Sequence, residues 1–89
     1  MRTTYFYKKF KKDMKLQERR GKNMEKLKVI LDSLIEEKEL PEKNKDHALV
    51  GDFSGCRECH VEPDWLLIYR LEGGVVSFLR IGTHSDIFE

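Results

Sequence analysis

The sequence is poor in cysteine and proline and contains no long hydrophobic run. Only two cysteines and two prolines occur in its 89 residues. Because no stretch of about 18 apolar residues is present, and no apolar leader with a cleavage site, we expect neither a membrane span nor a secretory signal. Cys56 and Cys59 lie too close together in the sequence to form the disulfide framework of a secreted domain. These absences favour a cytoplasmic protein.

The chain is short and highly charged. A length of 89 residues with 39% hydrophobic and 37% charged side chains fits one compact domain, residues 1–89, and excludes two. Such a domain has a thin hydrophobic core. The five Phe, three Tyr and one Trp must therefore supply much of the core.

Charge is distributed unevenly along the chain. Residues 1–45 carry 14 of the 17 basic side chains and eight of the 16 acidic ones, a net charge of +6, which leaves −5 for residues 46–89. The basic group begins with Lys8, Lys9, Lys11 and Lys12. Such a positive field attracts a phosphate backbone or an acidic partner, but the same pattern also occurs on a solvated helix face. Both interpretations stay open from charge alone.

Hydrophobic periodicity predicts two helices near the N-terminus. Residues 3–7 favour a short leading strand. Apolar side chains then recur at helical spacing over residues 8–20 and, more strongly, over residues 22–38, with Gly21 between the two segments. A short glycine-containing connection predicts that the helices pair as an antiparallel hairpin.

The last third of the chain changes to a strand pattern. Residues 53–61, 64–71 and 75–81 are rich in β-branched and aromatic side chains and are separated by tight turns. Strands joined so closely form an antiparallel meander, and the helical hairpin supplies a cover for one of its faces. The predicted fold class is α+β, with an irregular connection over residues 40–51.

All three histidines lie in or beside the predicted sheet. His47 precedes it, His60 ends its first strand and His84 follows its last strand. Converging imidazoles can act as general acid and base near neutral pH without a metal. A single histidine, by contrast, is more often structural, so the clustering carries the argument.

The segment Cys56–His60 matches the C-x-x-C-H pattern of covalent haem attachment. Haem attachment of this type requires export, and the motif lies here within a predicted strand. On a strand Cys56 and Cys59 point to opposite faces, so they cannot chelate one zinc ion without a local turn. We therefore interpret them as small buried thiols.

Four sequence blocks carry a family resemblance. They are KDHALVG at 45–51, RECHVEPDWLLIY at 57–69, LRIGTHSD at 79–86 and the closing pair Ile87–Phe88. In order and spacing they resemble the YafQ branch of the RelE-like bacterial toxins. The helical hairpin also matches that family's layout, so the resemblance covers nearly the whole chain and implies the RelE-like fold.

The resemblance implies a ribosome-dependent endoribonuclease that cleaves mRNA in the A site of the small subunit. It also implies a DinJ- or RelB-type antitoxin as partner, with a disordered acidic tail that folds over the toxin. Promoter DNA would be contacted only through the antitoxin complex. No cofactor, metal or membrane is implied.

The family pattern assigns candidate site residues to this sequence. It implies catalytic roles for His47, His60, Asp64, Arg80 and His84, and RNA contacts for Glu58 and Phe88. We also assign RNA contacts to the lysines at positions 8, 9, 11 and 12. In our hypothesis His84 is the principal acid or base, Asp64 orients His60 as its partner, and Arg80 steadies the phosphate charge. Glu58 departs from the aspartate that some members carry.

The chemistry of these residues agrees with that assignment. Cleavage of RNA needs a base for the 2′-hydroxyl, an acid for the 5′-oxygen and a cation for the phosphorane, and it leaves a 2′,3′-cyclic phosphate and a 5′-hydroxyl. Two other classes of protein stay open. One is a binding module that uses the basic helices, and the other is a metal or haem protein built on the C-x-x-C-H segment.

Single residues also have structural interpretations. Asp64 also fits a turn position, Trp65 fits the core better than a base-stacking role, and Phe88 also fits the edge of a small core.

Overall fold

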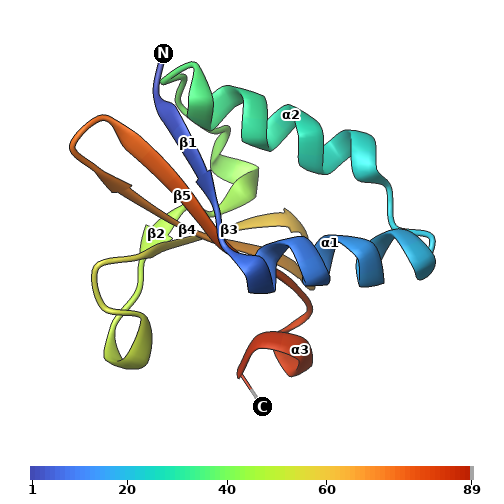
Figure 1. Cartoon of the computed structure of the whole chain (residues 1–89). Helices are drawn as coiled ribbons and strands as arrows, with labels where there is room; N and C mark the ends of the chain where they lie inside the picture. Colours follow the sequence, from blue (N-terminus) through green and yellow to red (C-terminus); the bar gives the residue numbers. More distant parts are fainter. Residues whose placement is uncertain (89) are drawn as a thin grey trace.

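The computed structural model describes residues 1–88 as a five-stranded sheet with two long helices on one face (Figure 1). The strands are β1 (Thr3–Phe6), β2 (His47–Ala48), β3 (Arg57–Glu62), β4 (Trp65–Glu72) and β5 (Val75–Gly82). The helices are α1 (Lys8–Arg19), α2 (Met24–Ile35) and α3 (His84–Phe88), and two 3₁₀ turns are η1 (Glu42–Asn44) and η2 (Gly51–Phe53). The predicted α+β fold is confirmed.

The sheet has the order β1-β5-β4-β3-β2. Strands β3, β4 and β5 form the predicted antiparallel meander, and β2 adds to its edge antiparallel to β3. The leading strand β1 pairs parallel with β5. The two strands farthest apart in sequence therefore lie side by side.

The helices α1 and α2 run in opposite directions and are joined at Gly21, as predicted (Figure 1). Gly21 has a φ of 79°, a conformation in which glycine meets no steric penalty. Helix α2 begins after Asn23, whose side chain accepts a hydrogen bond from the Glu25 N–H and caps the helix. It ends at Ile35, short of the predicted residue 38, because Glu37 adopts the left-handed conformation. No helix within residues 1–88 is long and apolar enough to cross a membrane.

Apolar side chains form one cluster on each face of the sheet. The cluster under the helices joins Phe10 of α1 and Leu27, Ile30 and Leu34 of α2 to Trp65, Leu67 and Phe78 of the sheet. The smaller cluster on the other face contains Cys56, Leu66, Ile68 and Ile87. The sequence predicted a cover for only one face. In the structure α3 and the η2 loop partly cover the second.

Two predictions about local structure were wrong, and one short helix was missed. The strand predicted over residues 53–61 begins only at Arg57, because Gly51 and Gly55 adopt positive φ angles of 74° and 87° and turn the chain through η2. His47 does not lie in an irregular connection but pairs with Glu58 as part of β2. Helix α3 was not predicted, since five residues are too few to display a helical period.

Candidate active site

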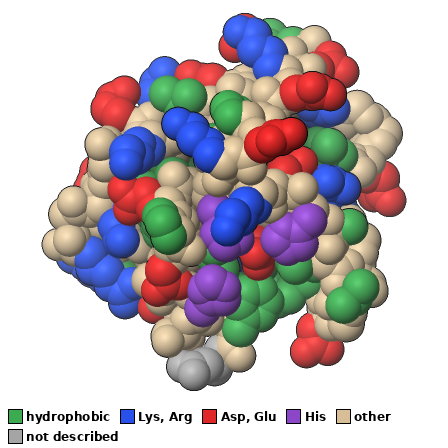
Figure 2. Space-filling view, turned by 180° about the vertical axis from the view of Figure 1, so that it is seen from behind, with side chains coloured by type: hydrophobic (Ala, Val, Ile, Leu, Met, Phe, Trp, Pro, Cys, Tyr) green, Lys and Arg blue, Asp and Glu red, His purple; other side chains and the backbone are tan. Residues whose placement is uncertain are grey.

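The register of the sheet gathers the predicted polar residues on the face opposite α1 and α2. Directly opposed residues in neighbouring strands point to the same side of a sheet. The pairs His47 with Glu58, Glu58 with Ile68, and Ile68 with Arg80 form one row across four strands. His60 lies in the next row, opposite Leu66. Figure 2 shows the three histidines together on this face.

Glu58 lies between two of the histidines. One of its carboxylate oxygens, Oε1, is 3.5 Å from Nε2 of His47 and 3.4 Å from Nε2 of His60. The Glu58 residue is only 5% exposed, so this carboxylate is largely shielded from water. A proton on Nε2 of either ring therefore has a shared acceptor.

Backbone carbonyls fix the other nitrogen of both rings. Nδ1 of His47 lies 2.7 Å from the Lys45 carbonyl oxygen, and Nδ1 of His60 lies 3.1 Å from that of Pro63. A carbonyl oxygen only accepts, so Nδ1 carries the proton in each ring. Nε2 is thereby left as the atom of each ring that can exchange a proton.

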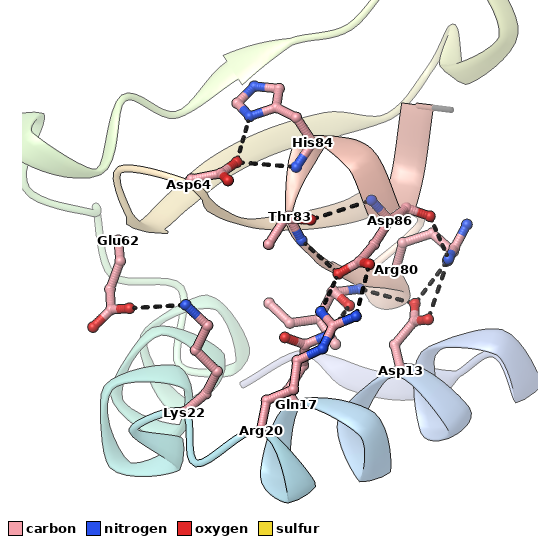
Figure 3. A network of polar contacts seen from close by, with 11 residues as sticks. Asp13, Gln17, Arg20, Lys22, Glu62, Asp64, Arg80, Thr83, His84 and Asp86 are labelled. Atoms are coloured by element: carbon pink, nitrogen blue, oxygen red, sulfur yellow. Dashed lines mark hydrogen bonds and ion pairs between the residues drawn. The ribbon is translucent and has the colours of Figure 1, made fainter.

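Asp64 holds His84 (Figure 3). Its Oδ1 accepts a hydrogen bond from the His84 backbone N–H at 3.0 Å and lies 2.7 Å from Nδ1 of the ring. These two contacts lower the pKa of the Asp64 carboxyl. Our hypothesis that Asp64 orients His60 is therefore wrong: its partner is His84, and the carboxylate beside His60 is Glu58. Nε2 of His84 has no hydrogen-bond partner among residues 1–88, and the side chain is 58% exposed.

The three imidazoles and two phenyl rings form a series in which each ring neighbours the next. Ring centroids are 6.4 Å apart for His47 and His60, 6.3 Å for His60 and His84, and 6.2 Å for His84 and Phe88. Phe88 meets Phe53 edge to face at 5.7 Å. Sequence analysis did not select Phe53, because it was assigned to a strand and not to the η2 loop. We call this series of five rings the ring arc.

Arg80 lies in the same row as Glu58 but is bound elsewhere. Its guanidinium makes two hydrogen bonds to the Asp13 carboxylate, at 2.7 and 3.2 Å, and a third to the Asp86 carbonyl at 3.4 Å. The bonds to Asp13 raise the pKa of Arg80. Asp13 also accepts from the Ile81 N–H at 3.1 Å, beyond the end of β1. Arg80 is thus fixed at the β5 edge and makes no hydrogen bond to the rings within the described chain.

Helix α3 is held in place by Asp86. Its Oδ2 accepts from the Thr83 N–H at 2.9 Å, while the Thr83 hydroxyl accepts from the Asp86 N–H at 3.2 Å, a reciprocal cap. Arg20, which directly follows α1, donates two hydrogen bonds to the same carboxylate, at 2.7 and 3.1 Å. Together these contacts hold the pKa of Asp86 well below its usual range. They also fix His84, the first residue of α3.

Asp46 anchors β2. Its carboxylate accepts from the Tyr69 hydroxyl at 2.6 Å and from Nε of Arg57 at 3.2 Å. Sequence analysis missed Asp13, Asp46 and Asp86 as supporting residues. Asp46 and Asp86 are acidic residues close in sequence to predicted site residues, and Asp13 is an acidic residue within the basic helix. Acidic residues in such positions are too common to identify a supporting residue.

The four lysines assigned to RNA binding lie on α1, which packs on the opposite face of the sheet from the histidines. Lys8, Lys9, Lys11 and Lys12 are all exposed, and none forms an ion pair with another residue of the described chain. They therefore form a separate positive surface and do not line the histidine cluster.

The cysteines do not form a metal or haem site. Cys56 belongs to the apolar cluster on the histidine face, whereas Cys59 belongs to the cluster under the helices. Burial raises the pKa of the Cys59 thiol to about 12, so it stays protonated at neutral pH. Both are free and buried, as predicted. Trp65 is completely buried, which confirms its predicted place in the core.

Comparison with known proteins agrees with the geometry. Residues 2–89 match the family model described as the bacterial toxin of type II toxin-antitoxin system, YafQ. The chain is 46% identical over 80 residues to the mRNA interferase toxin YafQ of Escherichia coli K12, a match that covers 89% of this chain and 87% of the relative.

Solved structures are similarly close. The crystal structure of YafQ from E. coli BL21(DE3) has a TM-score of 0.96 and 41% identity, with 100% of both chains covered. The E. coli DinJ-YafQ complex gives a TM-score of 0.94 and 42% identity, again with 100% of both chains covered. The fold is that of a toxin from a type II toxin-antitoxin system. The chain belongs to the YafQ family of such toxins.

Proposed function

We propose that this protein cleaves translated mRNA in the ribosomal A site by general acid and base catalysis. As a YafQ-family toxin it is an mRNA interferase, which is an endoribonuclease. The observation that carries the proposal is His84, whose Nδ1 is fixed by Asp64 and whose ring lies beside the imidazole of His60. Its Nε2 has no hydrogen-bond partner among residues 1–88. Such a ring is oriented and accessible, as a general acid or base requires.

The chemical step uses a nucleophile from the RNA itself. The 2′-hydroxyl attacks the adjacent phosphorus, and one imidazole takes its proton. The bond from phosphorus to the 5′-oxygen breaks, and a second imidazole donates a proton to that oxygen. A 2′,3′-cyclic phosphate and a 5′-hydroxyl result.

We assign the two proton-transfer roles to His84 and His60, whose ring centroids are 6.3 Å apart. Glu58 lies between His60 and His47, so these two residues can pass a proton to or from His60. Arg80 contributes positive charge for the phosphorane from the β5 edge. Phe88, which is 46% exposed beside His84, offers a face for stacking on a base of the codon.

The proposal includes partners and a location. The exposed lysines of α1 would contact ribosomal RNA phosphates, since they form a positive surface separate from the histidines. A DinJ-type antitoxin would neutralise the toxin, as the complex of the E. coli relative suggests. The protein would then act in the cytoplasm, and it would reach promoter DNA only with that antitoxin.

The test is primer extension on a message translated in a purified system, followed by chemical analysis of the new RNA ends. We expect codon-phased cuts with cyclic-phosphate ends for the wild type. His84→Ala should lower the cleavage rate by about 100-fold or more. Ser85→Ala, the matched control on the exposed side of α3, should cleave like the wild type.

Two results would contradict the proposal. Equal cutting with and without ribosomes would contradict the proposed dependence of cleavage on the ribosome. An intact message with both the wild type and Ser85→Ala would remove the nuclease itself and favour the alternative of a binding module.

A further inference from the structure

Two tyrosines and an arginine form a group at the β1 edge of the sheet. The rings of Tyr5 and Tyr7 meet edge to face, with centroids 5.3 Å apart and an interplanar angle of 85°. Nη2 of Arg70 donates a hydrogen bond to the Tyr7 hydroxyl at 3.1 Å. Neither the acid and base chemistry nor the ring arc uses these side chains. We call the three residues the tyrosine patch.

The tyrosine patch lies on the same face of the sheet as the histidines. Tyr5 is opposite Ser77, and Ser77 is opposite Arg70, so these residues form one row across β1, β5 and β4. Arg70 is two positions from Ile68 on β4, and residues two positions apart on a strand share a face. Ile68 belongs to the row of Glu58. The patch therefore occupies the row next to one row of the candidate active site.

The patch is too far from His60 for one nucleotide to contact both. The row of His60 and the row of Arg70 are four residues apart along β4, about 13 Å. Strands β3 and β1 are three strand spacings apart, about 14 Å. These two displacements give a separation of about 20 Å across the face. A ligand that reaches both places must be a polymer that crosses this face of the sheet.

Tyr5 offers an aromatic surface to solvent. This residue is 58% exposed, whereas Tyr69 in the core is only 1% exposed. An edge-to-face contact covers at most one face of a ring, so the contact with Tyr7 leaves a face of Tyr5 open to a planar ligand. The same contact restricts the rotation of the Tyr5 ring, which reduces the entropy lost when a ligand stacks on it. The Tyr5 ring is thus suited to stacking.

The charge around the patch favours an anionic ligand. Arg70 donates to a neutral hydroxyl and forms no ion pair within residues 1–88. Lys8 and Lys9, which directly follow Tyr7 in the chain, are exposed. The acidic residue on this face of β4 is Glu72, which lies two positions beyond Arg70 and farther from the histidines. The three cations outnumber this carboxylate, and a positive surface of this kind attracts a phosphate backbone.

We propose that the tyrosine patch binds one nucleotide of single-stranded RNA, whose base stacks on Tyr5 and whose phosphate pairs with Arg70. Aromatic rings beside cations are the means by which proteins commonly hold single strands. A protein partner fits less well, because the row of Tyr5, Ser77 and Arg70 has no aliphatic side chain to form the apolar centre of an interface. The inference rests on the proposed function, since an RNA on the histidine face brings a nucleotide to β1.

The first test measures binding without cleavage. The probe is a single-stranded oligoadenylate of about six nucleotides, a length within the range of single-strand sites. Its 2′-hydroxyls are methylated, so it lacks the nucleophile of the cleavage reaction. It is titrated into the full chain while the tyrosine ring signals are followed by NMR, and we expect the Tyr5 signals to shift with a dissociation constant below about 1 mM. The buried Tyr69 is the internal control and should not shift.

Two variants at one position separate stacking from other effects, with the Tyr7 signals as the measure of binding. Tyr5→Leu keeps an apolar side chain but removes the ring, so it should weaken binding about tenfold. Tyr5→Phe keeps the ring and should bind like the wild type. An abasic strand of the same length and charge should bind the wild type and Tyr5→Leu equally. Equal affinity of all three proteins for the oligoadenylate, or an equal shift of Tyr5 with the abasic strand, would overturn the proposal.

A crosslinking experiment identifies the source of the nucleotide. A photoreactive phenylalanine analogue replaces Tyr5, and the protein is bound to a ribosome that carries a message methylated at the 2′-hydroxyls of the A-site codon. A crosslink to the message assigns the patch to substrate binding, and a crosslink to ribosomal RNA assigns it to binding of the ribosome. Both results support an RNA nucleotide at the patch. Crosslinks to ribosomal protein alone, or none, would overturn it.

The binding result is separable from the proposed nuclease. If the Tyr5 signals shift as expected but the translated message stays intact, the tyrosine patch is supported and the nuclease is not. Codon-phased cleavage without a shift of the Tyr5 signals would overturn the tyrosine patch alone.

Discussion

Each of the three histidines contacts one of two carboxylates. Glu58 is buried and shared by His47 and His60, whereas Asp64 is exposed and holds His84. In the first relation, only the placement of Glu58 and His60 on the same face follows from sequence, since the two residues are two positions apart on one strand. The second does not, because Asp64 and His84 meet only after the sheet has assembled. The resemblance therefore selected three histidines that the structure brings together, while the partner of Asp64 required the structure.

The bond between Asp64 and His84 leads to a prediction at this scale. Asp64→Asn keeps the size of the side chain but removes the negative charge beside Nδ1 of His84. We expect cleavage to fall by about tenfold or more, since a charged partner favours the protonated ring in the transition state. Single-turnover cleavage of a programmed ribosome measures the effect. Asp52→Asn, an exposed acid in η2, serves as the control, and an equal loss in both variants would contradict the prediction.

Asp86 gives a prediction about stability and pH. Its pKa is depressed in the folded protein, so its contribution is fully present above the ordinary aspartate value of about 4 and is lost as the pH falls through the lowered folded value. Asp86→Asn should reduce the free energy of unfolding by about 1–2 kcal/mol at neutral pH. In urea titrations the difference from wild type should shrink below about pH 4. A difference that grows on acidification would contradict this assignment.

At the scale of elements, length decides what the sequence can predict. Helices α1 and α2 and strands β4 and β5 repeat their pattern often enough to be recognised. Strand β2 has two residues and α3 has five, so neither displays a period, although both carry site residues. Their positions come from tertiary contacts, namely the bonds of Asp46 to Tyr69 and Arg57 for β2 and the bonds of Arg20 to Asp86 for α3.

The close approach of β5 and α3 can be tested at Gly82. A Cβ atom at this position would lie 2.8 Å from Cβ of Asp86, which is too close for real atoms. Gly82→Ala should therefore displace α3 and His84, lower stability by about 1–3 kcal/mol and reduce cleavage by more than the loss of folded protein explains. Thermal unfolding and cleavage at a temperature where the variant is folded would separate the two effects. Unchanged cleavage would show that α3 tolerates the shift.

At the scale of the whole molecule, the two faces of the sheet differ in the titratable side chains that they present. The histidines lie on one face, and the helix with the free lysines packs on the other. This separation predicts that Lys12→Glu weakens ribosome binding and lowers its salt dependence by about one unit on logarithmic axes. Lys28→Glu on α2, where the lysine is already paired with Asp32, should have a smaller effect. Sedimentation with ribosomes at several salt concentrations measures both, and identical slopes would argue against a role for α1.

The pairing of β1 with β5 also determines when the sheet can be completed during synthesis. Thr3 is hydrogen-bonded to the strand that contains Val75, about 70 residues later in the chain. A contact of such long range is slow to form, and it cannot form at all until β5 has been synthesised. The nascent toxin therefore lacks a complete sheet, and with it a row of site residues, for most of its synthesis. The candidate active site is thus complete only at the end of synthesis.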